Sequence, residues 1–326
     1  MSRILQTLLT LVFICPSAVA NVAASDFPLK PIKFIVPSSA GGPTDLIARR
    51  FGEKLGERLG QRIIIENRAG GRTVGPGEVA NAARDGYTLL FTVDAYLTVN
   101  PALYTALPYD PKKDFASVAI VAALNNFVLA VHPSVPVRTV RQYVDLAKAK
   151  TKGMSAANAG SGSPAHLVTA LFALKAEVEL LHVPYRGGNL AVSDLIGGHV
   201  PSMFAPAQNA VGPVKEGLIV PLAVTGRSRF SLLPDVPTFA EAGFPSIDLN
   251  QGFWYGVVAP AGTPPEVLSR LAKEFTEIAK SEDMVKSLAT LGVDAVALGP
   301  EEMTRTIQDD TMRWGAIVRE AGIKVE

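Results

Sequence analysis

The fold is decided by a stretch that runs from residue 32 to residue 59 and reads IKFIVPSSAGGPTDLIARRFGEKLGERL. Its first five residues form an apolar run that is typical of a buried β-strand. Residues 45–59 place Ile47, Phe51, Leu55 and Leu59 at steps of four, which predicts an amphipathic helix. A strand, a glycine-rich turn and a helix in this order form the repeating unit of an α/β fold.

The same alternation continues along the chain. It predicts further strands at residues 62–66, 87–92, 127–131, 154–157, 181–183, 200–204, 220–224 and 251–258, and further helices at residues 140–150, 164–174, 189–196, 266–280, 284–291 and 301–321. The pattern favours an α/β fold with a largely parallel sheet. Because it restarts near residue 127 without a flexible linker, we expect two domains that face each other across a cleft, a common place for a ligand.

Charge is nearly balanced in this chain of 326 residues, with 31 Lys and Arg against 30 Asp and Glu. No long basic run occurs, which argues against nucleic acid and anionic membranes as partners. The four histidines, His132, His166, His182 and His199, lack the spacing of a metal site, and Cys15 is the only cysteine. We therefore expect neither a metal nor a cofactor.

Residues 1–24 have the pattern of a secretory signal peptide. Arg3 gives a positive start, residues 4–15 form an apolar run too short to span a bilayer, and residues 18–20 offer an Ala-x-Ala cleavage site. Residues 22–24 offer a second site, so the secreted chain is expected to begin at Asn21 or Ser25. Lipidation of Cys15 is disfavoured because the bulky Ile14 precedes it.

The turn at residues 37–45, PSSAGGPTD, is a candidate anion site. Its glycines let the backbone approach a ligand closely, and the first N–H groups of a helix are unpaired and lie at the positive end of the helix dipole. The turn matches neither a nucleotide P-loop nor a dinucleotide fingerprint. The alternative is a plain strand-to-helix turn that is capped by Thr44 or Asp45.

A second turn, NAGSGSP at residues 158–164, occupies the same place between a strand and a helix. One such turn in each domain would hold one anion from both sides. Ser163 and His166 also raise the alternative of a serine hydrolase, but no G-x-S-x-G elbow is present. Asp94 follows a strand and is either a ligand hydrogen-bond acceptor or the residue that closes an Asx-turn.

The order of short motifs resembles the Bug family, the periplasmic solute-binding proteins of tripartite tricarboxylate transporters. The resemblance covers about residues 27–324 and rests on VP (36–37), AGG (40–42), Asp45, ENR (66–68), DGYT (85–88), GSGS (160–163), HVPYRG (182–187), PDVPT (234–238), WYG (254–256) and APAGTP (259–264). Each motif alone is modest, whereas the ordered series is hard to explain by chance.

The resemblance implies a type II periplasmic-binding-protein fold with two domains and a ligand cleft between them. Residues 26–124 and 250–326 would form the first domain, and residues 125–249 the second. The protein would be a non-enzymatic carboxylate binder of the periplasm. The resemblance, together with the position of Asp94 after a strand, gives these candidate ligand-binding residues: Ala40, Gly41, Gly42, Asp45, Asp94, Ala159, Gly160, Ser161, Ser163 and His166.

The implied partners are a small organic acid and the membrane subunits of a tripartite transporter, with the binding protein itself a monomer. A ligand sensor that contacts a membrane receptor kinase is the alternative role. Three places depart from the family pattern: Ser38 stands where Phe is frequent, residues 70–72, GGR, replace a more glycine-rich stretch, and residues 205–209, APAQN, are unusual. These departures are expected to affect ligand preference more than overall function.

The signal-peptide pattern predicts the start of the secreted protein. In a periplasmic extract, mass spectrometry is expected to find the chain beginning at Asn21 or Ser25, because signal peptidase cleaves after a small-x-small pattern. Intact Met1 on most of the native protein would contradict this expectation.

Overall fold

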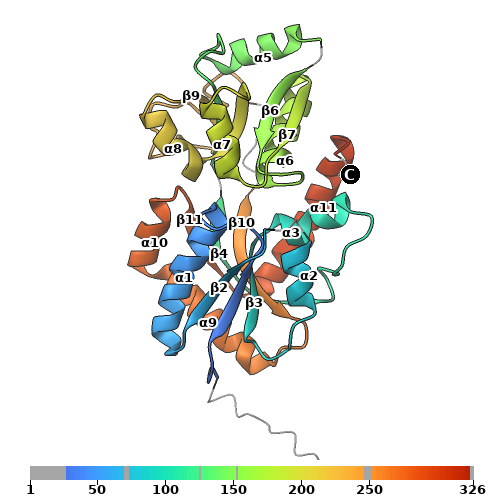
Figure 1. Ribbon diagram of the computed structural model, residues 1–326, viewed down its shortest axis with the longest axis vertical. Coiled ribbons are helices and arrows are strands. Elements are labelled where there is room, and N and C mark those ends of the chain that lie inside the picture. The colour runs from blue at the N-terminus through green and yellow to red at the C-terminus, as the bar shows by residue number, and fades with distance from the viewer. Residues whose placement is uncertain (1–26, 70–72, 125, 152, 246–251, 324–326) are drawn as a thin grey trace, which may run out of the picture.

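The computed structural model describes residues 27–69, 73–124, 126–151, 153–245 and 252–323, so the predicted signal peptide lies outside the described residues. Two separate β-sheets organise these residues, and helices cover both sheets (Figure 1). We call the part built on the six-stranded sheet the first lobe, and the part built on the five-stranded sheet the second lobe. None of the described helices is both long and apolar enough to cross a membrane.

The six-stranded sheet has the order β11-β4-β10-β3-β1-β2. Its strands are β1 (Ile32–Val36), β2 (Ile63–Asn67), β3 (Thr88–Val93), β4 (Phe115–Leu124), β10 (Phe253–Pro260) and β11 (Asp294–Leu298). Strand β1 pairs in parallel with β2 and β3, whereas β10 runs antiparallel to β3 and β4. The edge strand β11 is also antiparallel to β4.

Helices lie on both faces of this sheet (Figure 1). They are α1 (Pro43–Leu59), α2 (Val74–Ala80), α3 (Ala95–Thr98), α4 (Asn100–Leu103), α9 (Pro265–Lys280), α10 (Glu282–Ala289) and α11 (Pro300–Glu320). On one face the Phe34 ring stacks on Phe275 of α9 at 5.8 Å. On the other face Ile35 belongs to a core that includes Val79 of α2 and Met303 of α11. Coverage on both faces explains why β1 is apolar almost throughout.

The five-stranded sheet has the order β7-β6-β8-β5-β9. Its strands are β5 (Phe127–Val131), β6 (Met154–Asn158), β7 (Leu180–Pro184), β8 (Ser202–Pro206) and β9 (Val220–Val224), and its helices are α5 (Val140–Ala149), α6 (Pro164–Ala176), α7 (Gly188–Ile196) and α8 (Ala207–Lys215). Strand β6 is parallel to β7 and β8, and β5 is antiparallel to β8 and β9.

The prediction of a largely parallel sheet is wrong, because both sheets are mixed. The chain leaves the first lobe after β4 and returns to it at β10, and both strands run antiparallel to their neighbours in the sheet. Four substantial elements were also absent from the sequence prediction: α2, β4, α8 and β11. The remaining predicted elements are present, with ends that differ by up to a few residues.

Aromatic rings hold the two lobes together where the chain passes between them. The ring of Phe127, which begins β5, meets the ring of Phe253, which begins β10, at 5.7 Å and 72°. Phe253 in turn stacks on Trp314 of α11 at 4.6 Å and 15°. All three side chains are buried, and α11 also contacts α6 of the second lobe. This aromatic column fixes where the two sheets approach each other.

The aromatic column predicts a large stability effect for Phe253. Replacing Phe253 with Ala is expected to lower the free energy of unfolding by about 3–5 kcal/mol, because a buried ring leaves a cavity between two others. Urea denaturation followed by fluorescence measures the change. Met312→Ala is the control, since Met312 is 68% exposed on the same lobe and is expected to change stability by less than about 0.5 kcal/mol.

Candidate functional site

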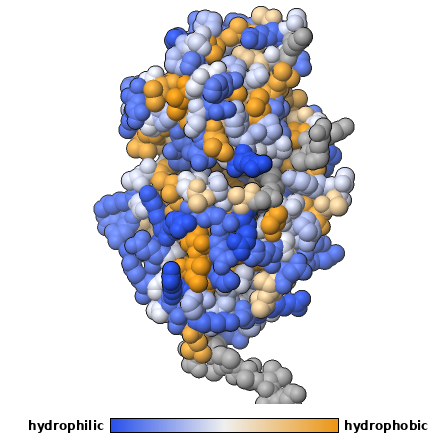
Figure 2. Space-filling model, in the orientation of Figure 1, coloured by the Kyte–Doolittle hydropathy of each residue, from blue (hydrophilic) through white to orange (hydrophobic). Residues whose placement is uncertain are grey.

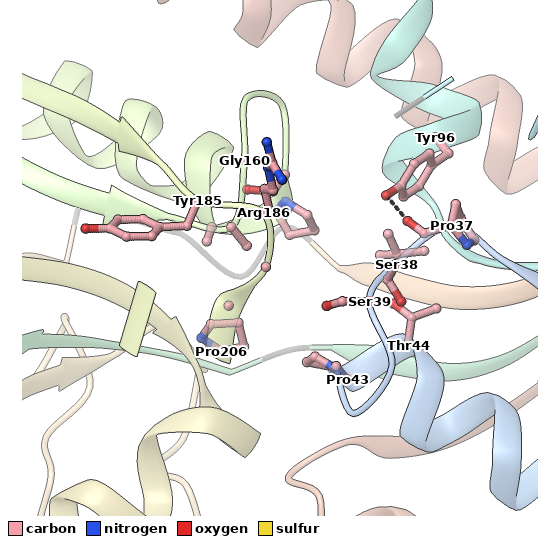
Figure 3. A pocket seen from close by; sticks show the side chains of 18 of the residues that line it. Pro37, Ser38, Ser39, Pro43, Thr44, Tyr96, Gly160, Tyr185, Arg186 and Pro206 are labelled. Carbon is pink, nitrogen blue, oxygen red and sulfur yellow. Dashed lines mark hydrogen bonds between the residues drawn. The ribbon is translucent and has the colours of Figure 1, made fainter. Parts of the chain in front are cut away.

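A cavity of about 610 Å³ lies between the lobes and is lined by residues of both. In Figure 3, Pro37, Ser38, Ser39 and Thr44 of the first lobe face Gly160, Arg186 and Pro206 of the second lobe. The lobes also come close directly beside the cavity, because a Cβ atom at Gly187 would lie 3.3 Å from Ser39 Oγ. The cavity therefore depends on both sheets for its walls.

The first wall is the turn between β1 and α1. Gly42 is the N-cap of α1 and has extended geometry, at φ −73° and ψ 165°, while Gly41 has the left-handed φ of +75°. No N-cap side chain bonds to the first turn, so the expected alternative of a cap by Thr44 or Asp45 is not what the structure has. Since Pro43 has no N–H, Thr44 and Asp45 supply the first amides of this helix.

Asp45 organises this turn from behind the cavity. Its carboxylate accepts hydrogen bonds from the Gly41 amide at 2.8 Å, from Arg49 Nε at 2.9 Å and from Asn67 Nδ2 at 2.9 Å. Burial alone would raise the pKa of Asp45, but the bonds from Arg49, Gly41 and Asn67 lower it overall. The charged Asp45 side chain therefore holds the shape of the turn through these three hydrogen bonds.

The second wall is the turn between β6 and α6. Two of its backbone amides donate hydrogen bonds to side chains of the same turn and helix. The Gly160 amide donates to Asn158 Oδ1 at 3.0 Å, and the Gly162 amide donates to His166 Nδ1 at 2.8 Å. Both glycines have positive φ, at +110° and +71°. Gly160 and Gly162 thus shape the turn, while their N–H groups are already bonded.

The Ser163 and His166 side chains do not form a nucleophile–base pair through Nδ1. Ser163 Oγ is the N-cap of α6 and accepts a hydrogen bond from the His166 backbone N–H at 3.3 Å. The Nδ1 atom of His166 is taken by the Gly162 amide, and its ring packs edge-on against His182 at 4.3 Å. These contacts give both residues a role in holding the turn.

The ten residues predicted for the site divide into two groups. Five line the cavity: Gly42, Ala159, Gly160, Ser161 and Ser163. The other five do not line it: Ala40, Gly41, Asp45, Asp94 and His166. Ala40 and Gly41 are exposed on the turn, whereas Asp94 is buried at the start of α3, where its amide donates to the Trp254 carbonyl at 2.9 Å.

Sequence reasoning missed a third turn that lines the cavity, at residues 185–188 between β7 and α7. It contains Arg186, followed by two glycines and a helix, which is the same arrangement that singled out the other two turns. Tyr96 and Tyr255 also line the cavity from α3 and β10. Tyr96 donates to the Pro37 carbonyl at 2.6 Å (Figure 3), and no local pattern marks such a long-range contact.

The chain is similar in sequence and fold to a group of known proteins. A family model described as tripartite tricarboxylate transporter family receptor matches residues 47–323. Protein BugT of Bordetella pertussis is 33% identical over 318 residues, which are 97% of each chain. A solved R. palustris protein with adipate has a TM-score of 0.86 and 31% identity, and covers 92% of this chain and 100% of its own.

A second solved structure, MatC from Rhodopseudomonas palustris with bound malate, has a TM-score of 0.82 and 30% identity, and covers 90% of this chain and 100% of its own. These matches span both lobes. They confirm the predicted α/β fold of periplasmic binding proteins.

The imidazole pair beneath the second turn predicts a pH dependence of stability. Burial lowers the pKa of His182 in the folded protein, so His182 stays neutral there while the unfolded chain binds a proton below about pH 6.5. The free energy of unfolding is therefore expected to fall as the pH drops from about 6.5 through the folded-state pKa. Chemical denaturation in steps of pH measures this slope.

His182→Phe keeps a ring against His166 but cannot take up a proton. The variant is expected to show a shallower loss of stability over the same acidic range. Curves for the variant and the wild type that run parallel below about pH 6.5 would show that His182 does not cause the slope.

Proposed function

The chain belongs to the tripartite tricarboxylate transporter receptor family, the Bug family of periplasmic binding proteins, and we propose that it captures a small organic acid in the cavity between its lobes. One carboxylate of the ligand is held between the turn before α1 and the turn before α6. The protein then delivers the ligand to the membrane subunits of a tripartite transporter. It acts as a monomer in the periplasm, after cleavage of the signal peptide.

The observation that carries this proposal is the convergence of two helix N-termini on one cavity. Gly42 and Thr44 line it at the start of α1, and Ser163 and Pro164 line it at the start of α6. Helix N-termini favour anions, because their first amides are unpaired and lie at the positive end of the dipole. An anion that binds to both termini would therefore hold the two lobes together.

The polar lining supports the same class of ligand. Ser38 Oγ is buried at the cavity wall and has no hydrogen-bond partner among the described residues, so a ligand oxygen would satisfy a donor that is otherwise lost. No Asp or Glu occurs among the described lining residues. A carboxylate in this cavity therefore meets donors on two sides and no repelling charge.

The ligands of related proteins agree with this class. The R. palustris structure contains adipate and the MatC structure contains malate, and both are small organic acids. We propose that the two lobes correspond to domains at residues 26–124 with 250–326 and at residues 125–249. An acid bound between them would favour a closed arrangement, because only the closed form offers donors from both turns.

The anion site predicts binding of acids and a loss of binding when Gly42 gains a side chain. Thermal-shift measurements with adipate, malate and other small acids are expected to find at least one that raises the melting temperature, whereas its fully amidated form does not. Gly42→Val is expected to weaken binding of that acid at least about tenfold, because the side chain enters the cavity. Calorimetry measures the Kd.

The extended backbone of Gly42 accommodates valine, although a Cβ there would lie 3.1 Å from the Ser39 carbonyl oxygen. The melting temperature without acid therefore serves as a check on folding. Gly212→Val is the matched control, since a Cβ at Gly212 of α8 meets nothing within 4 Å. Equal affinity of wild type and Gly42→Val for the acid would show that the ligand does not bind at the first turn.

A further inference from the structure

Arg186 is the one charged side chain among the described residues that line the cavity. It lies on the turn between β7 and α7, beside Gly160 in Figure 3. Its side chain is exposed and makes no ion pair or hydrogen bond with the part of the chain that the structure describes. The guanidinium group is therefore free to meet a ligand.

The backbone that carries Arg186 is held on both sides. Before it, the Tyr185 amide donates to the Asn158 carbonyl at 3.0 Å, and the Tyr185 hydroxyl donates to Asp194 Oδ2 at 2.7 Å. After it, Gly187 lies against Ser39 of the first lobe. Arg186 thus combines a fixed backbone at the meeting of the lobes with a side chain that can move.

Two acidic residues of the helices that follow the first and third turns, Asp45 of α1 and Asp194 of α7, are engaged elsewhere. Asp45 is bonded to Arg49, Asn67 and the Gly41 amide, and it does not line the cavity. Asp194 accepts from Tyr185 and pairs with His199 at 3.4 Å. A ligand in the cavity consequently meets a cation from Arg186 and finds no carboxylate among the described lining residues.

We infer that Arg186 determines specificity by binding a second anionic group of the ligand, next to the carboxylate that the two turns hold. The inference rests on the proposed function. A second anionic group gains a charge-assisted hydrogen bond from the guanidinium, a neutral amide gains little, and an ammonium group is repelled without compensation. Dianionic acids are therefore selected over zwitterionic amino acids of the same length.

The cavity has room for this arrangement. At about 610 Å³ it has room for an acid with a chain of a few carbons in addition to the carboxylate that the turns hold. Tyr96, Tyr255 and Pro206 line the same cavity and supply apolar surface for such a chain. Its lining thus combines polar groups, at the turns and at Arg186, with apolar surface from these three side chains.

The test measures Kd by calorimetry for linear dicarboxylates from succinate to suberate, for the monoamide of each, and for 6-aminohexanoate as a zwitterion. Wild type is expected to bind the best dicarboxylate more tightly than its monoamide, and 6-aminohexanoate most weakly. Arg186→Gln is expected to weaken the dicarboxylate about tenfold to a hundredfold and to leave the monoamide within about twofold. The two ligands then bind the variant almost equally.

Arg305→Gln is the matched control, because Arg305 is an exposed arginine on α11 that does not line the cavity. It makes the same change in net charge and is expected to leave every Kd unchanged. If Arg186→Gln weakens dicarboxylate and monoamide equally, Arg186 holds the first carboxylate and the inference is wrong. If a monoamide binds and no dicarboxylate does, the inference is also wrong, while failure of every acid overturns the proposed function itself.

Discussion

The whole arrangement depends on how the chain passes twice between its two sheets. Strand β4 ends in the first lobe three residues before β5 begins in the second, and β10 brings the chain back. Phe127, Phe253 and Trp314 pack face and edge at this place, and Phe253 pairs in register with Leu124 of β4. Because Leu124 and Tyr255 also line the cavity, the crossing strands form its floor and set the distance between the turns above it.

The three turns use different physical means to face the cavity. The first leaves the start of α1 without a side-chain cap and relies on Asp45 behind it for its shape. In the second turn, two backbone amides donate hydrogen bonds to the side chains of Asn158 and His166, and Ser163 caps α6. The third contributes the charge of Arg186. Each lobe thus presents a helix N-terminus to the cavity, whereas the cation comes from the second lobe alone among the described lining residues.

Local sequence patterns predicted the strand–turn–helix units well, because each is encoded within about 30 residues by apolar periodicity and glycine placement. Strand direction was not predicted, since periodicity is the same for parallel and antiparallel strands. Helix α8 was missed because Gly212 and Pro213 interrupt its pattern, although the helix continues to Lys215. Five of the ten predicted site residues line the cavity. Tyr96 and Tyr255 were missed because only tertiary structure brings them there, whereas Arg186 lies in a strand–turn–helix unit whose local pattern could have marked it.

The uncapped start of α1 has a consequence for how such a protein changes over evolutionary time. A mutation can remove any side chain, but only a mutation to proline removes a backbone N–H. The donors at the start of α1 therefore survive almost every substitution in the gene, while Ser38, Tyr96 and Arg186 can each be replaced in a single step. If the start of α1 holds a carboxylate as proposed, a lineage with this architecture can exchange one acid for another without passing through a form that no longer binds carboxylates.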